Sequence, residues 1–429
     1  MLCRIVVFSL LLCHLISAAS LSETEKRIVA AVDATREDSN SFLERIVNIN
    51  SGTLNPDGVR RVADVLKPEF EALGFSVRWI PMAEVQRAGH LVIERKGTHG
   101  KRVLLVGHMD TVFEPSSPFQ KFERTGDAAK GPGAADMKGG LMVILFALKA
   151  LNSAGALDGT NITVVLTGDE EKPGNPLSIA RRDLIEAGRN SDVALEFEGG
   201  SRNADGREFA TIARRSASAW HLKSTGTTAH SSGIFNSRVG DGAIYELTRI
   251  LNAFHEQLRE PDLTYNVGVM LGGSTVEYDP KTNAGSATGK VNIIPNVAYA
   301  SGDIRTIDDQ QLQRTRDKMR AIVEKHLPNT GAEIRFDEGY PSMPATEGNK
   351  SVLNVLNSVN RDLNLETMEP LPPAQRGAGD LSFVAPYTNS LSGLGAVGRG
   401  SHAPGEMIDL TRQPIQTKRT AILIYRLTR

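Results

Sequence analysis

Five short segments of this chain carry imidazole and carboxylate side chains beside what we predict to be the ends of β-strands. The segments are GHMDTV, GPGAADMKGG, TGDEEKPG, LEFEGG and GRGSHAPGE. The side chains in them that can bind a metal are His108, Asp110, Asp136, Glu170, Glu171, Glu198 and His402. Zinc takes imidazole and carboxylate ligands, and bound zinc turns water into a nucleophile at neutral pH. Together the five segments indicate a binuclear zinc hydrolase.

The first segment places a histidine and an aspartate two residues apart. His108 directly follows the strand-like run RVLLV, and Asp110 comes two residues later. Residues i and i+2 of a strand face the same side, so the Asp110 carboxylate can hold the imidazole in its metal-binding tautomer. A turn histidine beside a capping aspartate explains the same pair without a metal.

The second segment surrounds an aspartate with glycines. Asp136 opens an apolar helix, with Gly133 before it and Gly139 and Gly140 after it. An N-cap aspartate would explain this position structurally. The glycines also leave room for ions on both sides of the carboxylate, as a ligand that bridges two metals roughly 3.5–4 Å apart requires.

The remaining carboxylates also follow strand-like runs. Glu170 and Glu171 leave the strand in opposite directions, so one can bind metal while the other faces the attacking water; a solvated acidic loop is the alternative. Glu198 ends the apolar run DVALEF, where a buried carboxylate must be paired or coordinated. His402, in a glycine-rich loop, would supply the second imidazole.

The elements that must position these residues follow an α/β pattern. The runs FSVRWI, HLVIER, RVLLVGH, ITVVLTGDEE and DVALEFE predict strands, and residues 135–155 predict a helix that is buried on nearly all sides. Such alternation predicts a catalytic domain with a mainly parallel central sheet flanked by helices. We expect this domain to be discontinuous, formed by residues 20–212 and 307–429.

The pattern changes between these two parts. Residues 213–306 contain an alternating strand, an amphipathic helix at 241–259 and two further strands around a loop. This order fits a smaller, ferredoxin-like α+β domain inserted into the first. After Thr306 we expect the catalytic domain to resume, with a charged helix to His326 and a strand near AEIRF.

Composition limits the class of protein. The chain has 429 residues, 40% hydrophobic and 23% charged, which are values of a globular protein. A formal net charge of −1 provides no global field to attract nucleic acid or an anionic membrane. We therefore expect neither as a partner, and a charged substrate must be recognised locally.

The N-terminus has the order of a secretory signal peptide. Arg4 precedes an apolar run, which small residues follow up to Ala19. We expect residues 1–19 to be removed and the protein to be secreted or periplasmic; a membrane anchor is the alternative. Cys3 and Cys13 both lie in this segment, so the mature chain would have no disulfide and no cysteine chemistry.

In their order and approximate spacing, GHMDTV, GPGAADMKGG, GDEE, the strand-terminal FE and the late GSH resemble a known family. It is the di-zinc metallopeptidase family of glutamate carboxypeptidases, aminoacylases, succinyl-diaminopimelate desuccinylases and carnosinase-like dipeptidases. The resemblance covers essentially the whole mature chain and is greatest with the secreted bacterial glutamate carboxypeptidases.

The resemblance implies a role for each metal ligand. Asp136 would bridge two zinc ions, for which cobalt or manganese could substitute. His108 and Glu198 would complete one site, and Glu171 and His402 would complete the other.

The resemblance also implies catalytic and substrate-binding roles. Glu170 would be the general base, and Asp110 would support His108. His230 would reach the partner subunit's active site in a homodimer formed through the inserted domain, and there stabilise the oxyanion; a surface loop histidine is the alternative. The substrate-binding residues implied are Asn292, Arg305 and Arg376.

The chain is therefore expected to be an exopeptidase that releases a C-terminal amino acid, in the first instance glutamate. An N-acyl-amino-acid deacylase or a dipeptidase could use the same metals, and a non-catalytic amino-acid or peptide binder is a remote alternative. Gly199 stands where these carboxypeptidases have proline, and EKPGNP replaces their serine-glycine run. These departures put the substrate, more than the chemistry, in doubt.

Overall fold

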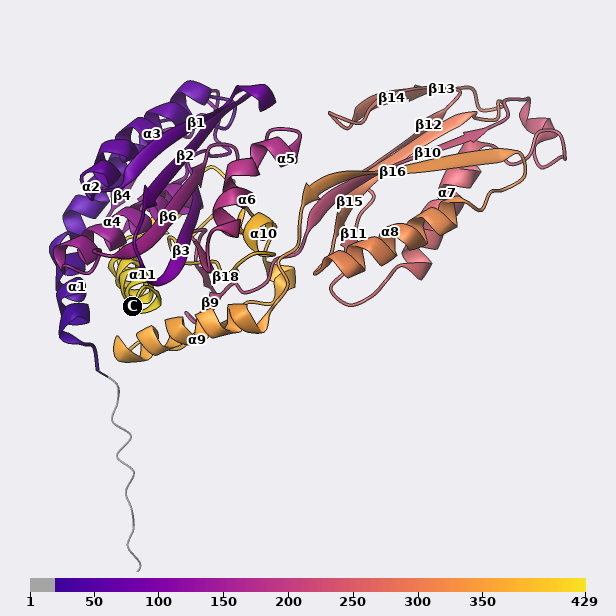
Figure 1. The fold of residues 1–429 in the computed structure, drawn as a ribbon. Coiled ribbons are helices and arrows are strands. Elements are labelled where there is room, and N and C mark those ends of the chain that lie inside the picture. Colours follow the sequence, from indigo (N-terminus) through magenta and orange to yellow (C-terminus); the bar gives the residue numbers. More distant parts are fainter. Residues whose placement is uncertain (1–19) are drawn as a thin grey trace, which may run out of the picture.

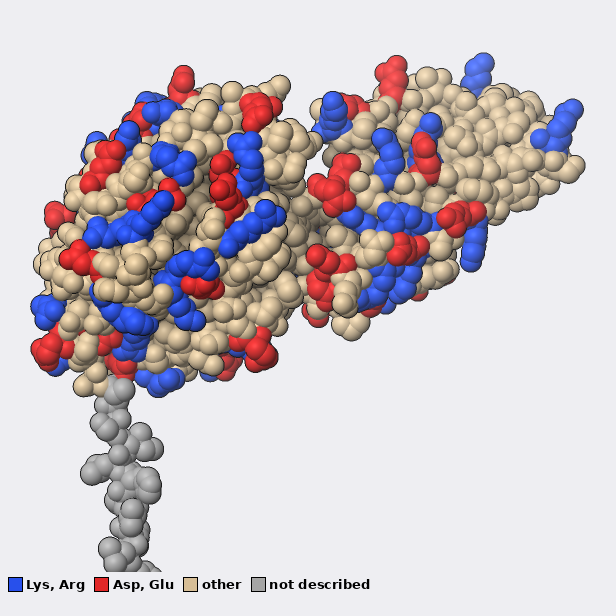
Figure 2. All heavy atoms as spheres, in the orientation of Figure 1, with Lys and Arg blue, Asp and Glu red and all other residues tan. Residues whose placement is uncertain are grey.

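The computed structural model describes residues 20–429, which form two lobes (Figure 1). The signal-peptide prediction for residues 1–19 lies outside the described residues. Among the helices in the described range, none has the length and apolarity that crossing a membrane requires. On the face that Figure 2 shows, acidic and basic side chains are interspersed over both lobes.

The first lobe is built on a mixed, largely parallel sheet. The strand order is β1(Ser76–Met82), β2(Arg87–Arg95), β6(Thr160–Thr167), β3(His99–His108), β7(Val193–Glu196), β18(Asn389–Leu391). β3 pairs in parallel with β6 and β7, and β18 pairs in parallel with β7, whereas β1 and β2 add antiparallel strands at one side. The predicted α/β class with a mainly parallel sheet is confirmed.

Helices cover both faces of this sheet because its strands are apolar on both faces. Along β3, Val103 and Leu105 pack into the larger core, and the alternating Leu104 and Val106 pack into a smaller one. The helices of the larger core are α1(Glu23–Ala34), α2(Arg36–Val47), α3(Pro56–Glu71), α4(Gly139–Ser153), α9(Glu347–Asp362) and α11(Gln413–Leu427). On the other face lie α6(Arg182–Arg189) and α10(Leu381–Val384), preceded by α5(Leu177–Ala180).

Short strands at the edges of the first lobe hold its loops. One small sheet has the order β17(Glu369–Pro370), β9(Glu208–Ala210), β8(Ser201–Arg202). Another has the order β19(Gly398–Arg399), β20(Met407–Asp409), β5(Ala128–Lys130), β4(Glu123–Thr125). The loop that carries His402 joins β19 to β20.

The second lobe is an antiparallel sheet with helices on one face. Its strand order is β11(Thr264–Tyr265), β15(Val297–Arg305), β10(Ala217–Gly226), β16(Thr330–Tyr340), and β12(Val269–Gly273) also pairs with β15. Figure 1 shows α7(Ala243–Gln257) and α8(Asp309–Val323) on one side of this sheet. The hairpin of β13(Thr275–Asp279) and β14(Ala284–Thr288) lies on the other side.

The second lobe extends further along the chain than expected, so the boundary predicted at residue 306 is wrong. The strand expected near AEIRF exists, but as β16 it pairs with β10 from Thr330 to Tyr340. Met319 and Val323 of α8 pack with Trp220 in the core of the second lobe. An amphipathic helix and an alternating strand do not indicate locally which of two sheets they join, and sequence reading assigned them to the wrong one.

Within the described residues the chain crosses between the lobes twice, and the two crossings lie side by side. Arg214 and Met343 exchange backbone hydrogen bonds of 2.9 Å in both directions. The second lobe is thus inserted into the first through a paired, two-stranded connection.

Candidate metal centre

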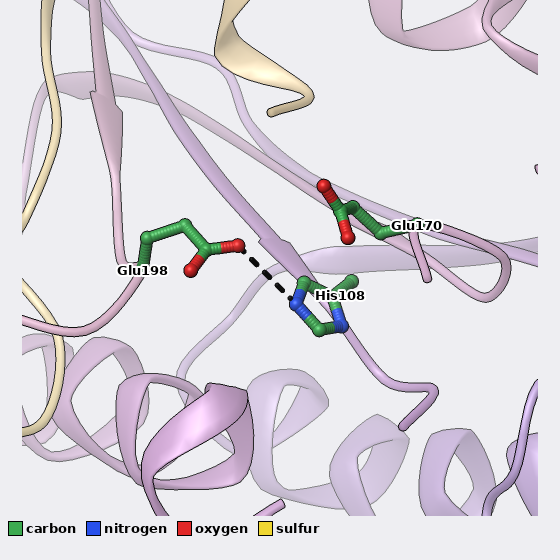
Figure 3. Close-up of side chains that lie close together, drawn as sticks. All are labelled: His108, Glu170 and Glu198. Carbon is green, nitrogen blue, oxygen red and sulfur yellow. Dashed lines mark ion pairs between the residues drawn. The ribbon is translucent and has the colours of Figure 1, made fainter. Parts of the chain in front are cut away.

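The predicted ligands converge because parallel strands bring their carboxyl ends to one edge of the sheet. His108 is the last residue of β3, Glu170 and Glu171 follow β6, and Glu198 follows β7. Asp136 comes from the segment that leads into α4, and His402 from the loop between β19 and β20. In Figure 3, Glu170 and Glu198 lie on either side of His108.

Asp136 stands between the two imidazoles. Its Oδ1 lies 3.3 Å from His108 Nε2, and its Oδ2 lies 3.2 Å from His402 Nε2. Glu198 Oε1 is 3.3 Å from His108 Nε2, and Glu171 Oε2 is 3.1 Å from His402 Nε2. Ligand atoms at the usual distance from one tetrahedral zinc lie roughly 3.3 Å from each other. The five side chains therefore have the spacing of two ion sites that share Asp136.

The protonation pattern of His108 also fits a cation. Its Nδ1 lies 3.0 Å from the Asp110 carbonyl oxygen, which can only accept a hydrogen bond, so Nδ1 carries the proton. If His108 binds a metal it must be unprotonated at Nε2, and its lone pair there faces Asp136 and Glu198. His108 Nε2 and Glu171 Oε1 are buried atoms without a hydrogen-bond partner in the structure. These residues fit a pair of bound ions.

The carboxylates around Asp136 favour a positive charge between them. Hydrogen bonds from His402 to Asp136 and Glu171 raise the pKa of His402 to about 11. Burial raises the pKa of the Glu170 and Glu171 carboxyl groups above their usual range. His402 has a left-handed backbone with a φ of 65°, which is uncommon for a residue with a Cβ and recurs at functional sites.

Asp110 does more than the sequence predicted. Its carboxylate is 3.4 Å from His108 Nδ1, so the nearer partner of that nitrogen is the Asp110 carbonyl group. The carboxylate accepts hydrogen bonds from the backbone N–H groups of Glu170 (3.0 Å) and Glu171 (3.1 Å) and from Thr53 Oγ1 (2.6 Å). Asp110 therefore positions the loop that carries Glu170 and Glu171 (the glutamate loop, residues 168–174) as well as the imidazole.

The segment around Asp136 is held by a carboxylate that sequence reasoning missed. Glu406 is buried and accepts hydrogen bonds from the N–H groups of Ala135 (2.7 Å), Asp136 (2.8 Å) and Gly133 (3.3 Å). Burial raises the pKa of Glu406 to about 7. The Asp136 side chain caps no helix and is free to face the imidazoles. Glu406 follows His402 in the segment GRGSHAPGE, but nothing local in the sequence indicates that it bonds the distant residues around Asp136.

Arg376, predicted to bind substrate, lies beside the predicted metal ligand Glu198. It donates a hydrogen bond of 2.9 Å to the Gly199 carbonyl oxygen and lies 3.9 Å from Glu198 Oε2. Arg214 holds the following loop through the carbonyl oxygens of Gly377 and Ala378, and it pairs with the buried Glu196 at 2.6 Å.

Three predicted residues are not brought to the centre in one copy of the chain. His230 and Asn292 lie close together in the second lobe, with 3.5 Å between His230 Nε2 and Asn292 Nδ2, and both are exposed. Arg305 pairs with Asp303 at 2.9 Å. In the range 20–429, none of the three forms a hydrogen bond or ion pair with the predicted metal ligands.

A buried network behind Glu170 was also missed. Arg181 is fully buried and bonds Asp380 Oδ1 (2.6 Å), Asp169 Oδ1 (2.7 Å) and the Tyr340 hydroxyl group (2.8 Å). The Tyr340 hydroxyl group lies 3.0 Å from the Glu170 carbonyl oxygen. Asp169 beside Glu170 was the only local sign, because the partners are distant along the chain.

Sequence comparison relates the chain to known hydrolases. It is 30% identical over 319 residues to carboxypeptidase G2 of Pseudomonas sp. (strain RS-16), which covers 73% of this chain and 70% of that protein. It is 24% identical over 371 residues to succinyl-diaminopimelate desuccinylase of Gluconacetobacter diazotrophicus, which covers 84% of this chain and 90% of that protein.

Solved structures share the fold. Aminopeptidase PepT from Bacillus cereus ATCC 10987 superposes with a TM-score of 0.72 at 16% identity, over 92% of this chain and 99% of that one. The YXEP protein of Bacillus subtilis, a dinuclear metal binding peptidase, superposes with a TM-score of 0.61 at 14% identity, over 92% of this chain and 99% of that one.

A family model supplies the remaining comparison. The model of peptidase family M20/M25/M40 matches residues 104–426, which contain each of the predicted ligands. The strand-end cluster, the fold and this match agree. The chain belongs to peptidase family M20/M25/M40 and is a metal-binding hydrolase of that family.

Proposed function

We propose that this protein is a dinuclear zinc exopeptidase that hydrolyses the amide bond before a C-terminal amino acid, in the first instance glutamate. The observation that carries the proposal is the position of Asp136, whose two carboxylate oxygens face His108 and His402 at 3.3 and 3.2 Å. The similarity to carboxypeptidase G2 supports C-terminal release.

The chain's own residues would divide the work. His108, Glu198, Glu171 and His402 would hold the ions, and Asp136 lies between the two imidazoles. When bound, the ions lower the pKa of water and polarise the scissile carbonyl. Glu170, held beside His108 and Glu198, takes the proton from the attacking water and passes it to the leaving nitrogen.

Two arginine residues, one at the centre and one in the second lobe, would recognise the substrate's carboxylate. A guanidinium group grips a carboxylate with two parallel hydrogen bonds. Arg376 lies beside Glu198 at the centre, and Arg305 ends β15 of the second lobe together with Asp303. Asn292 would bind the substrate's backbone.

We also propose a homodimer formed through the second lobe. Phe235 (62% exposed) and Tyr245 (54%) lie together, with ring centroids 5.6 Å apart, and Met270 (58%) lies on the edge strand β12. Exposed apolar side chains and an edge strand suit pairing with a second copy of the chain. In that arrangement His230 would serve the partner's centre.

The dimer has its own test. Light scattering after gel filtration should give twice the mass of one chain for the wild type. Met270→Lys should give the mass of a single chain. A wild-type protein that is monomeric at micromolar concentration would rule out this arrangement.

We further propose that the N-terminal segment directs export of the protein. Arg4, the apolar run and the small residues up to Ala19 support removal of residues 1–19 and a secreted or periplasmic enzyme. N-terminal sequencing of the protein recovered from a secreting host should begin near residue 20. A chain that retains Met1 would contradict export by cleavage.

The second candidate function is N-acyl-amino-acid deacylation, or dipeptide hydrolysis. The similarity to a desuccinylase and the unusual Gly199 and EKPGNP segment favour keeping it. Pocket differences of one methylene shift selectivity only about 10–200-fold, so substrates must be compared directly. The test is kcat/KM on N-acyl glutamates, other N-acyl amino acids, N-succinyl-diaminopimelate and dipeptides. Highest kcat/KM on C-terminal glutamate substrates is expected, and highest kcat/KM on another class would replace the carboxypeptidase assignment.

A further inference from the structure

Tyr340 belongs to the second lobe, but its hydroxyl group lies in the first. It is the last residue of β16, where it is paired with Ala217. Its hydroxyl group lies 3.0 Å from the Glu170 carbonyl oxygen and 2.8 Å from Arg181 Nη2. A side chain at the junction of the lobes therefore touches the backbone of the proposed general base.

The direction of these two hydrogen bonds is fixed by chemistry. Arg181 can only donate and the Glu170 carbonyl oxygen can only accept, so the Tyr340 hydroxyl group accepts from the first and donates to the second. Burial keeps the pKa of Tyr340 well above its usual value, so the donating proton stays in place.

Arg181, which binds the hydroxyl group, is itself fixed by hydrogen bonds to two carboxylates. Its Nε bonds Asp380 at 2.6 Å, and its Nη1 bonds the Asp169 carboxylate at 2.7 Å. The ring of Tyr340 packs edge-on against Phe383, with centroids 5.0 Å apart, and the guanidinium carbon lies 5.7 Å from the Tyr340 centroid. The contacts of Arg181 with Asp169 and Asp380 lie within the first lobe.

The first lobe holds both peptide groups of Glu170, and the second lobe also holds the one that joins Glu170 to Glu171. Its N–H group, and that of Glu171, donate to Asp110 in the first lobe at 3.0 and 3.1 Å. Its carbonyl group accepts from Tyr340 of the second lobe. Loss of the Tyr340 hydroxyl group would leave the peptide group between Glu170 and Glu171 with its contact to Asp110 but without its contact to the second lobe.

We propose that Tyr340 is a positioning residue through which the second lobe holds the general base Glu170 in its working orientation. The proposal rests on the proposed function for the role of Glu170. Because Arg305 and Asn292 also belong to the second lobe, a movement of that lobe on the substrate would reach Glu170 through this hydroxyl group.

The kinetic test uses Tyr340→Phe in the full chain, which removes one oxygen and keeps the ring. Its matched control is Tyr265→Phe, since the Tyr265 hydroxyl group also donates to a backbone carbonyl, that of Phe254 at 2.8 Å, but in the core of the second lobe. We expect kcat of Tyr340→Phe to fall about 10- to 100-fold, as misplacement of a catalytic group does. KM and bound metal should not change, and the control should retain kcat.

A second measurement needs no substrate and so separates this proposal from the proposed function. Hydrogen exchange of the peptide covering residues 168–174, followed by mass spectrometry, reports on the glutamate loop. Exchange should be faster in Tyr340→Phe than in wild type and unchanged in Tyr265→Phe. Wild-type exchange in Tyr340→Phe, or an equal loss of kcat in both variants, would overturn the positioning role. Absence of amide hydrolysis by the wild type would instead reject the proposed function, with the exchange result still deciding the positioning role.

Discussion

Asp136 offers one carboxylate oxygen to each of two imidazoles, and this division sets the task of its neighbours. His108 and Glu198 lie on one side, and Glu171 and His402 on the other, at 3.1–3.3 Å between facing atoms. Four of these side chains come from strand ends or the segments just after them. Around the glutamate loop, Asp110 fixes backbone N–H groups, so the orientation of each ligand depends on contacts behind it.

Glu170 gives the sharpest prediction at this scale. Glu170→Gln keeps the size of the side chain but removes its ability to take a proton, so kcat should fall by at least about 100-fold. Metal content, measured by mass spectrometry of the acid-digested protein, should remain near that of the wild type. The exposed Glu324→Gln serves as the control. Near-normal kcat in Glu170→Gln would assign the proton transfer to another group.

The helix α4 shows how an element brings its ligand into place. Gly140 lies in its first turn, and a Cβ there would lie 2.1 Å from the Phe197 carbonyl oxygen. This close approach lets the start of α4, just after Asp136, pack against the end of β7, just before Glu198. Two ligands far apart in sequence are thereby held at a common centre.

Gly140→Ala should therefore destabilise the protein, although alanine is the better helix former by about 1 kcal/mol. The backbone clash must move α4 or β7, at a cost of about 1–3 kcal/mol. Calorimetry should show a lower Tm, and zinc titration should show weaker binding. Gly268→Ala, whose Cβ would come no closer than 3.7 Å to another atom, is the control. A raised Tm for Gly140→Ala would mean that the contact is easily relieved.

The second lobe contains a buried carboxylate, Glu246 of α7, that faces the loop after α8. Burial alone would raise the pKa of Glu246, but hydrogen bonds from Arg249, the Leu327 N–H group and His326 outweigh it and lower that pKa. A lowered folded-state pKa contributes stability above the unfolded value near 4.5, which is lost as pH falls through the folded value.

Because the pKa of Glu246 is lowered in the folded protein, we expect acid to destabilise this lobe. The Tm of the wild type should fall as pH decreases below about 4.5, whereas Glu246→Gln should have a lower Tm at pH 7 and a flatter decline in the acid range. Scanning calorimetry between pH 3 and 7 measures both. Parallel curves for the two proteins would remove Glu246 as a source of the acid sensitivity.

At the scale of the whole molecule, the sequence predicted the features that are local in the chain and missed those that join distant segments. His108, Glu171 and Glu198 were found because each follows an apolar run, and strand ends are local features. The network of Arg181 and Tyr340 was not found, since its members lie 159 residues apart and no local pattern joins them. The assignment of α8 and β16 failed for the same reason.

The family and the fold class predicted from the sequence are confirmed. The substrate, the metal, the dimer and export remain proposals with their own tests. His230 and Asn292 lie away from the predicted metal ligands of their own chain. Their predicted roles in oxyanion stabilisation and substrate binding therefore depend on the proposed dimer.

The most direct measurement is anomalous X-ray scattering at the zinc edge from crystals of the zinc-loaded protein. Two peaks should appear, roughly 3.5–4 Å apart, both in contact with Asp136. One peak should contact His108 and Glu198, and the other Glu171 and His402. A single peak, or two peaks that do not share Asp136, would contradict the dinuclear centre.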